Sequence, residues 1–219
     1  MTVYQQAQQE GQDVVRAAIL DAATHLLVTE GPVALTVRRI SAEVGCSTKV
    51  IYTLFGGKDS LTEALWLEGF ARIERRLLDL PEDHDPLARL RTGLQVYRAY
   101  ALAESDYYRV MFQGAIAGFS PSPDALETAK RSFLILVEGV ARCLEEGRLR
   151  GGTAEEIADV LWMAMHGAVS LEISGYFDEP MSSQRYRLLC DSVLTPFLPS
   201  DDLPSVDRPD DKLDERSAR

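Results

Sequence analysis

Apolar residues recur at the spacing of an α-helix along most of this sequence, and no segment alternates apolar and polar residues as a strand does. In residues 13–29, for example, Ile19 and Leu26 share one helix face. Gly31 and Pro32 then end the segment, because glycine accepts the left-handed cap conformation and proline cannot continue a helix. The pattern predicts an all-α fold.

Cap and stop signals divide the rest of the chain into further helices. Asp85 places a capping side chain before a proline at the first helical position, and Thr153 with Glu156 forms a capping box. The predicted later helices span 37–44, Ser47 to Phe55, Asp59 or Ser60 to about Leu80, 86 to about 103, about 106–117, 123 to about 150, 154 to about 176, and about 182–197.

The same signals divide the chain into four parts. Residues 1–12 and 199–219 are polar and poor in apolar side chains, so we expect a disordered N-terminal extension and a disordered acidic tail. Between them we expect a three-helix head at 13–58 and a larger helical domain at 59–198. A chain of this length can bury a substantial core.

Composition limits the location of the protein and the chemistry it can perform. No apolar run approaches the roughly 20 residues that cross a bilayer, and the polar start lacks the apolar core of a signal peptide. Cys46, Cys143 and Cys190 are odd in number and widely separated, as reduced thiols are. We therefore expect a cytoplasmic protein with no membrane partner.

Catalytic and metal-binding patterns are missing from the sequence. It contains no Gly-rich phosphate loop, no nucleophile elbow and no cluster with metal-ligand spacing. His25 and His84 have no partners at such spacing and are expected to be structural or exposed. The sequence therefore predicts neither an enzyme nor a bound metal or cofactor.

The segment after Gly45 carries groups that suit nucleic acid. Two short helices joined by a tight turn at 45–47 form a helix-turn-helix, in which the first residues of the second helix reach base edges. Ile51 and Phe55 lie one turn apart and would pack inward. The candidate DNA-binding residues are Thr36, Arg38, Ser47, Thr48, Lys49, Tyr52, Thr53 and Lys58.

Net charge by itself does not indicate DNA binding. Residues 1–80 carry eight Lys or Arg and ten Asp or Glu, a net charge of −2, so −9 of the total −11 lies beyond residue 80. Binding to a polyanion would depend on a few placed donors, with the bulk of the negative charge elsewhere. The alternative is that these donors form an ordinary solvated helix face.

The stretch TVRRISAEVGCSTKVIYTLFGGKDSLTEAL resembles the TetR family of bacterial transcriptional regulators, whose pattern runs T-x-x-x-I-A, G-V-S, Y-x-H-F, two residues and K. The resemblance covers residues 13–65. Three residues depart from it: Cys46 replaces a common Val, Lys49 a frequent Gly, and Leu54 a phosphate-contacting His or Tyr. The matching positions are Thr36, Ile40, Gly45, Ser47, Ile51, Tyr52, Phe55, Lys58 and Leu61.

A second stretch, LWMAMHGAVSLEISG at 161–175, resembles the W-x-x-x-H-G signature of a WHG-type TetR-like C-terminal domain. That resemblance implies a helical domain that senses an effector and forms a dimer. The aromatic and Met side chains of this larger helical domain either fill the core or line an apolar ligand site. The candidate ligand-binding residues are Tyr100, Tyr107, Met111, Phe112, Phe133, Trp162 and His166.

Dimerisation is expected because one recognition helix reads only a few base pairs and a two-fold operator needs two heads. The last two long helices carry small and apolar residues that suit a four-helix contact. The candidate interface residues are Ala164, Gly167, Ala168, Leu171, Leu189, Val193 and Phe197.

Taken together, the residues predict a homodimeric repressor that a small molecule releases from double-stranded operator DNA. No Lys or Arg lies among the candidate ligand-binding residues, so we expect a small apolar or weakly polar effector. Two other hypotheses remain at this point. The head could contact a protein partner, or the helical shell could enclose a small-molecule enzyme, although no catalytic constellation supports the latter.

Overall fold

The computed structural model describes residues 2–116 and 118–199, and within these ranges every regular element is helical. This confirms the predicted all-α class. The elements are α1 (Val3–Glu30), η1 (Pro32–Ala34), α2 (Val37–Val44), α3 (Thr48–Phe55), α4 (Lys58–Leu78), α5 (Pro86–Ala103), α6 (Ser105–Phe112), α7 (Pro123–Glu145), α8 (Ala154–Ile173), α9 (Met181–Leu194) and η2 (Thr195–Phe197).

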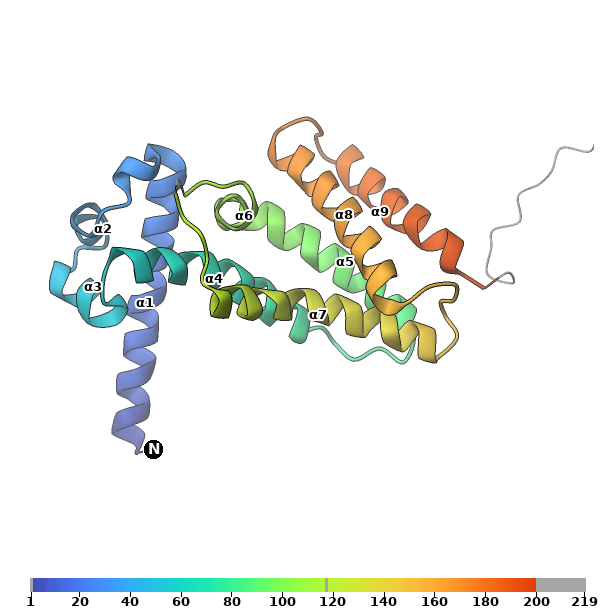
Figure 1. The fold of residues 1–219 in the computed structure, drawn as a ribbon, viewed down its shortest axis with the longest axis horizontal. Coiled ribbons are helices and arrows are strands. Elements are labelled where there is room, and N and C mark those ends of the chain that lie inside the picture. The colour runs from blue at the N-terminus through green and yellow to red at the C-terminus, as the bar shows by residue number, and fades with distance from the viewer. Residues whose placement is uncertain (1, 117, 200–219) are drawn as a thin grey trace, which may run out of the picture.

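Helices α1, α2 and α3 form a head at one end of the molecule, and α4 runs from this head into a larger helical body (Figure 1). α4 contacts α1 and α3 in the head, and α5, α6 and α7 in the body. α8 and α9 lie side by side along the far side of the body (Figure 1). One continuous helix therefore belongs to both the head and the body.

The head has its own small core, and its turn chemistry follows the sequence signals. Ile40 and Ile51 are fully buried, and Phe55 packs beside them. The Thr36 hydroxyl accepts a hydrogen bond from the Arg39 amide at 3.1 Å and so caps α2. Gly45 ends α2 at a φ of 73°, a left-handed conformation that strongly favours glycine. The helix-turn-helix geometry is thus determined locally.

The N-terminal end of α1 corrects one prediction. Residues 3–12, expected to be disordered, continue α1 as regular helix. Thr2 and Gln5 form a capping box, in which Gln5 N donates to Thr2 Oγ1 at 3.2 Å and Thr2 N donates to Gln5 Oε1 at 2.8 Å. Glutamine and alanine are good helix formers, so a polar segment joined to a formed helix can remain helical without burying apolar surface.

Most later boundaries lie near their predicted positions, with shifts at the helix ends. α4 begins one residue before the predicted start, at Lys58, while α6 ends at Phe112 and α7 at Glu145, each earlier than expected. Glycines with positive φ follow both of the shortened helices, Gly114 at 62° and Gly147 at 69°. The predicted tail at 199–219 lies outside the described residues except for Pro199.

None of the helices among the described residues is long and apolar enough to cross a membrane. The same part of the chain holds no group of three or more His, Cys, Asp or Glu side chains placed to bind a metal ion.

Candidate DNA-binding head and ligand cavity

The outward face of the head carries all eight residues that the sequence singled out for DNA. Thr36, Arg38, Ser47, Thr48, Lys49, Tyr52, Thr53 and Lys58 are all exposed. Tyr52 leaves 55% of its surface open although it is large and aromatic, whereas Ile51 is fully buried. The predicted division of α3 into an inner apolar face and an outer polar face is confirmed.

Three cations on this surface are not neutralised by the protein. Within the described part of the chain, Arg38, Lys49 and Lys58 make no ion pair. Arg39 differs, because its guanidinium contacts the carboxylates of Glu30 and Glu43, each at 2.7 Å. The three unpaired side chains can therefore approach phosphate oxygens without first breaking an internal contact.

The hydroxyl groups on this surface are less uniform than the sequence suggests. Thr53 donates its hydroxyl proton to the Lys49 carbonyl oxygen at 2.8 Å, so its donor is used within α3. Thr36 is engaged as the cap of α2. Ser47 occupies the predicted cap position of α3 but its side chain makes no capping bond. Among these three, Thr53 alone has its hydroxyl proton engaged, and Ser47 keeps both its donor and its acceptor available to a phosphate or a water.

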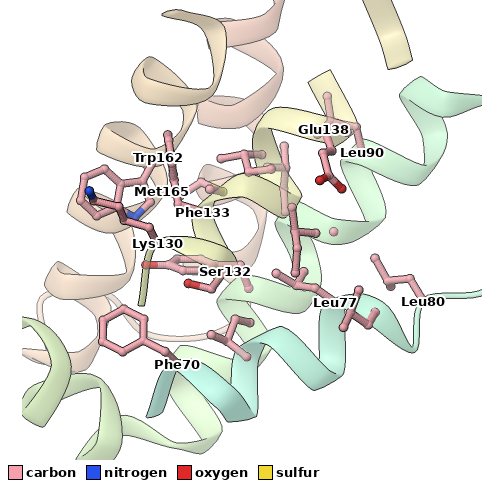
Figure 2. A pocket seen from close by; sticks show the side chains of 18 of the residues that line it. Phe70, Leu77, Leu80, Leu90, Lys130, Ser132, Phe133, Glu138, Trp162 and Met165 are labelled. Atoms are coloured by element: carbon pink, nitrogen blue, oxygen red, sulfur yellow. The ribbon is translucent and has the colours of Figure 1, made fainter. Parts of the chain in front are cut away.

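A cavity of about 550 Å³ lies in the body between α4, α5, α7 and α8 (Figure 2). Four of the seven candidate ligand-binding residues line it. These are Met111, Phe112, Phe133 and Trp162. α4 and α5 supply wall residues that the sequence analysis missed, among them Trp66, Phe70, Ile73, Leu77, Leu90 and Leu94. Their helical spacing is also that of ordinary core residues, so the sequence offers no signal that separates the two roles.

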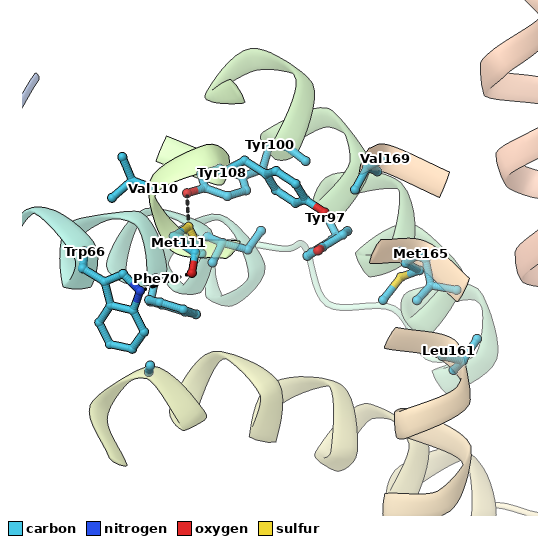
Figure 3. Close-up of a cluster of buried hydrophobic side chains, with 14 of the residues drawn as sticks. Trp66, Phe70, Tyr97, Tyr100, Tyr108, Val110, Met111, Leu161, Met165 and Val169 are labelled. Atoms are coloured by element: carbon cyan, nitrogen blue, oxygen red, sulfur yellow. Dashed lines mark hydrogen bonds between the residues drawn. The ribbon is translucent and has the colours of Figure 1, made fainter. Parts of the chain in front are cut away.

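The other three candidates are not among the residues that line the cavity. Tyr100 is fully buried beside Met111 (Figure 3). Its hydroxyl donates a proton to the Gly69 carbonyl oxygen at 2.6 Å. Tyr107 donates to Asp21 Oδ1 at 2.9 Å, on the side facing the head. His166 contacts the edge of the Phe112 ring, with centroids 4.6 Å apart. Each of the three contacts protein groups that the sequence could not identify.

Charged residues also reach the cavity, contrary to the expectation drawn from the candidate set alone. Arg89, Lys130 and Arg142 contribute to its boundary, together with Asp83, Glu138, Glu146 and Asp159. All of these except Arg89 are exposed, so they stand at the openings of the cavity. Arg89 Nη1 donates to the Leu80 carbonyl oxygen at 3.1 Å, and Lys130 pairs with Glu127 at 2.6 Å.

A polar junction connects the body to the head. Arg72 of α4 contacts Asp21 of α1 at 2.5 Å and Glu104 at 3.2 Å, at the end of α5. Its guanidinium also lies 4.3 Å from the ring centroid of Tyr107, which belongs to α6. α6 continues to Met111 and Phe112 in the cavity wall. α6 therefore contributes to the cavity wall and also contacts α1 of the head.

Two family models match separate parts of the chain. Residues 19–65 match the model described as bacterial regulatory proteins of the tetR family, and residues 90–193 match the tetracyclin repressor-like C-terminal domain. The chain belongs to the TetR family. The WHG-type resemblance is a finer assignment that neither match tests. No curated protein matches the chain.

Solved structures agree with the fold of this TetR-family chain. A protein of unknown function from Rhodococcus sp. RHA1 is 23% identical, with 84% of this chain and 96% of that chain covered and a TM-score of 0.71. A TetR family transcription regulator from Marinobacter aquaeolei VT8 is 16% identical, with 87% and 98% covered and a TM-score of 0.71. SmeT, the repressor of a Stenotrophomonas maltophilia multidrug efflux pump, is 20% identical, with 84% and 91% covered and a TM-score of 0.64.

The α8–α9 surface of this TetR-family chain has an exposed apolar stripe. Val160, Met163, Gly167 and Leu171 follow one another at intervals of three or four residues along α8, and all are exposed. Leu188 of α9 leaves 67% of its surface open. Of the seven candidate interface residues, Gly167 and Leu171 are exposed, and Ala164, Ala168, Leu189, Val193 and Phe197 are half-buried. Val160, Met163 and Leu188 are further exposed apolar residues that were not among the candidates.

His166 has a distinct environment at the inner side of this stripe. Its Nδ1 lies 3.0 Å from the Tyr108 hydroxyl and 3.3 Å from the Tyr97 hydroxyl, so it can accept a hydrogen bond from either. Burial lowers the pKa of His166 below its ordinary value of 6.5. The unfolded chain therefore takes up a proton at this position at a higher pH than the folded chain does.

We predict that His166 makes folding less stable in mild acid. Because the pKa of His166 is lower in the folded chain than in the unfolded chain, its contribution to the free energy of unfolding is complete above about pH 6.5. This contribution is lost as the pH falls below that value. His166→Asn keeps an acceptor for the two tyrosines but does not titrate. Wild type should lose more unfolding free energy than this variant between about pH 7.5 and 5.5, measured with urea. The exposed control His84→Asn should behave like wild type, and equal losses in all three proteins would contradict the prediction.

Proposed function

We infer that the protein, as a member of the TetR family, is a DNA-binding transcriptional regulator and not an enzyme. We propose that it acts as a repressor, binds a two-fold operator as a homodimer, and leaves that operator when a small apolar molecule occupies the cavity of the body. Binding to chromosomal DNA would place it in the cytoplasm. The observation that carries this proposal is the set of unpaired cations on the outer face of the head.

Lys49 and Lys58 have different roles in the proposed complex. Lys49 lies in the first turn of α3, where side chains of a helix-turn-helix reach base edges in the major groove. Lys58 is the first residue of α4, where unpaired backbone amides and the helix dipole also attract a phosphate. Tyr52 and Ser47 lie beside them and would donate to neighbouring phosphates.

The homodimer is supported by the exposed stripe on α8. A stripe of apolar side chains along a helix is typical of a helix–helix interface, and its central residue is Gly167. A Cβ atom built on Gly167 meets no heavy atom within 4 Å, so a second helix can approach the backbone closely there. A second copy of α8 and α9 would complete a four-helix contact.

Release by a ligand is supported by the path from the cavity to the head. An occupant that displaces Phe112 or Met111 moves α6, and α6 contacts α1 through the Tyr107 hydroxyl. The ligand would favour a head position that does not fit the operator, and operator DNA would weaken ligand binding by the same factor.

A helical module that uses its head to bind another protein is the second candidate, because a polar exposed helix face also suits such a partner. Salt dependence separates the two, since phosphate contacts require a steep loss of affinity with rising salt concentration.

We predict that Lys58→Ala weakens binding to all DNA sequences alike. Losing one phosphate contact should reduce the slope of log affinity against log salt by about 0.9. Lys49→Ala should instead change the preference among variants of an operator selected from fragments of the source genome, by about 1–3 kcal/mol at one base pair. Lys130→Ala, which removes the same charge far from the head, is the control. The role of Lys49 is rejected if its variant keeps both affinity and preference.

The dimer is tested by placing a charge on the α8 stripe. Met163→Glu changes a side chain that is 60% exposed in one copy, so the fold should tolerate it, while a buried charge at the interface should not be tolerated. Sedimentation should show a dimer for wild type and a monomer for the variant. Leu134→Glu alters a leucine of α7 that is 50% exposed, and this variant should remain a dimer. A monomeric wild type would refute the proposed assembly.

The coupling path is tested by Tyr107→Phe, which removes the hydroxyl donor to Asp21 but keeps the ring. Operator affinity without ligand should stay within about twofold of wild type. Phenylnaphthylamine, an uncharged apolar probe, should reduce operator affinity severalfold less in the variant than in wild type, because a bond of this kind contributes about 1.5–3 kcal/mol. Tyr176→Phe removes an exposed hydroxyl and should respond like wild type. An unchanged response of Tyr107→Phe would exclude this path.

A further inference from the structure

The cavity is long and narrow. Trp66, Phe70, Ile73 and Leu77 line it along successive turns of α4, and eleven residues of helix extend about 16 Å. α5 contributes wall residues from Pro86 to Tyr97, over the same length. A volume of about 550 Å³ over a length of about 16 Å corresponds to a mean cross-section of about 30 Å². An extended molecule fits this shape better than a compact one.

The two ends of the cavity differ in chemistry (Figure 2). At one end the walls are aromatic: the rings of Phe133 and Trp162 lie 5.8 Å apart, and those of Trp66 and Phe70 lie 4.7 Å apart. At the other end Leu77, Leu80 and Leu90 supply aliphatic walls, and the exposed Glu138 stands beside Leu90 at the opening. Flat rings stack favourably on aromatic side chains, whereas a hydrocarbon chain needs only apolar contact.

Two glycines provide the space at the aliphatic end. A Cβ atom on Gly139 would lie 3.5 Å from Leu90 Cδ1, and one on Gly93 would lie 3.6 Å from Leu80 Cδ1. Both distances are ordinary van der Waals contact, and both glycines line the cavity. A larger side chain at Gly139 would therefore press against Leu90 and narrow this end of the cavity.

Polar groups in the cavity favour an uncharged occupant. Six of its seven charged side chains are exposed at the openings, and a buried charge without a partner is costly. The Trp66 indole N–H already donates to the Met111 carbonyl oxygen at 3.2 Å. The Trp162 indole N–H has no hydrogen-bond partner in the part of the chain that the structure describes, and the residue is 37% exposed, so this donor is available to an oxygen at the opening of the cavity.

We propose that the cavity binds an elongated, uncharged molecule with a flat ring, a polar oxygen beside Trp162, and an aliphatic chain that runs towards Leu77 and Leu90. This inference names the ligand class of the effector site in the proposed function and rests on that assignment. The flat ring matches the aromatic end of the cavity, and the aliphatic chain matches the end formed by the leucines. The oxygen would accept a hydrogen bond from the Trp162 indole N–H.

The proposal is tested by calorimetry with para-alkylphenols carrying ethyl, butyl, hexyl and octyl chains. Affinity should rise about fourfold for each added methylene until the chain reaches the end of the cavity, which corresponds to ~0.8 kcal/mol. Octylbenzoate and octyltrimethylanilinium, of similar length but charged, should bind at least tenfold more weakly. Affinity that does not depend on chain length, or equal binding of the charged analogues, would overturn the proposal.

Two variants locate the ligand within the cavity. Gly139→Leu should remove the gain from the hexyl and octyl chains but leave ethylphenol binding at the wild-type level, which also shows that the fold is intact. Trp162→Phe keeps the ring but lacks the N–H, and should weaken all four phenols by a similar factor. An equal loss for short and long chains in Gly139→Leu contradicts the assigned orientation.

Operator affinity is measured separately from phenol binding. If the phenols bind with the expected length dependence and leave operator affinity unchanged, the ligand class stands and the release mechanism of the proposed function fails. If operator release occurs with no dependence on chain length, the release mechanism stands and the ligand class fails.

Discussion

The Arg72 guanidinium holds the head and the body of this protein together. It contacts Asp21 in the head, Glu68 on its own helix and Glu104 at the end of α5, and it lies over the ring of Tyr107. Its side chain is only 17% exposed and its partners Glu68 and Glu104 are half-buried, whereas Asp21 is 54% exposed and remains open to solvent. α4 is therefore joined to α1 and to the end of α5 through one shared polar cluster.

The sequence predicts the head well because the head depends on local signals. Thr36 and Gly45 determine the ends of α2 by capping and by backbone conformation, and the spacing of Ile51 and Phe55 identifies the inner face of α3. The cavity depends instead on which helices meet, and helical periodicity describes a wall residue and a core residue in the same way. Tyr100 was therefore assigned to the cavity although its hydroxyl is used by Gly69.

Ion pairing explains how an acidic chain can present a surface for DNA. Many basic side chains of α4, α5 and α7 are paired with carboxylates, as in Arg76 with Glu104, Arg98 with Glu172 and Lys130 with Glu127. The cations on the outer face of the head lack such partners within the described residues. A local positive surface thus arises from the distribution of carboxylates and not from an excess of lysine and arginine.

Both tryptophans of the chain belong to the cavity wall, Trp66 from α4 and Trp162 from α8. All indole fluorescence of this protein therefore originates beside the space that an occupant would fill. A molecule that enters the cavity would change the polarity around both indole rings and so change their fluorescence. A molecule that absorbs at the wavelength of indole emission would quench that fluorescence. The protein thus carries an intrinsic optical reporter of its own occupancy, and no label needs to be attached to the head, to α8 or to DNA.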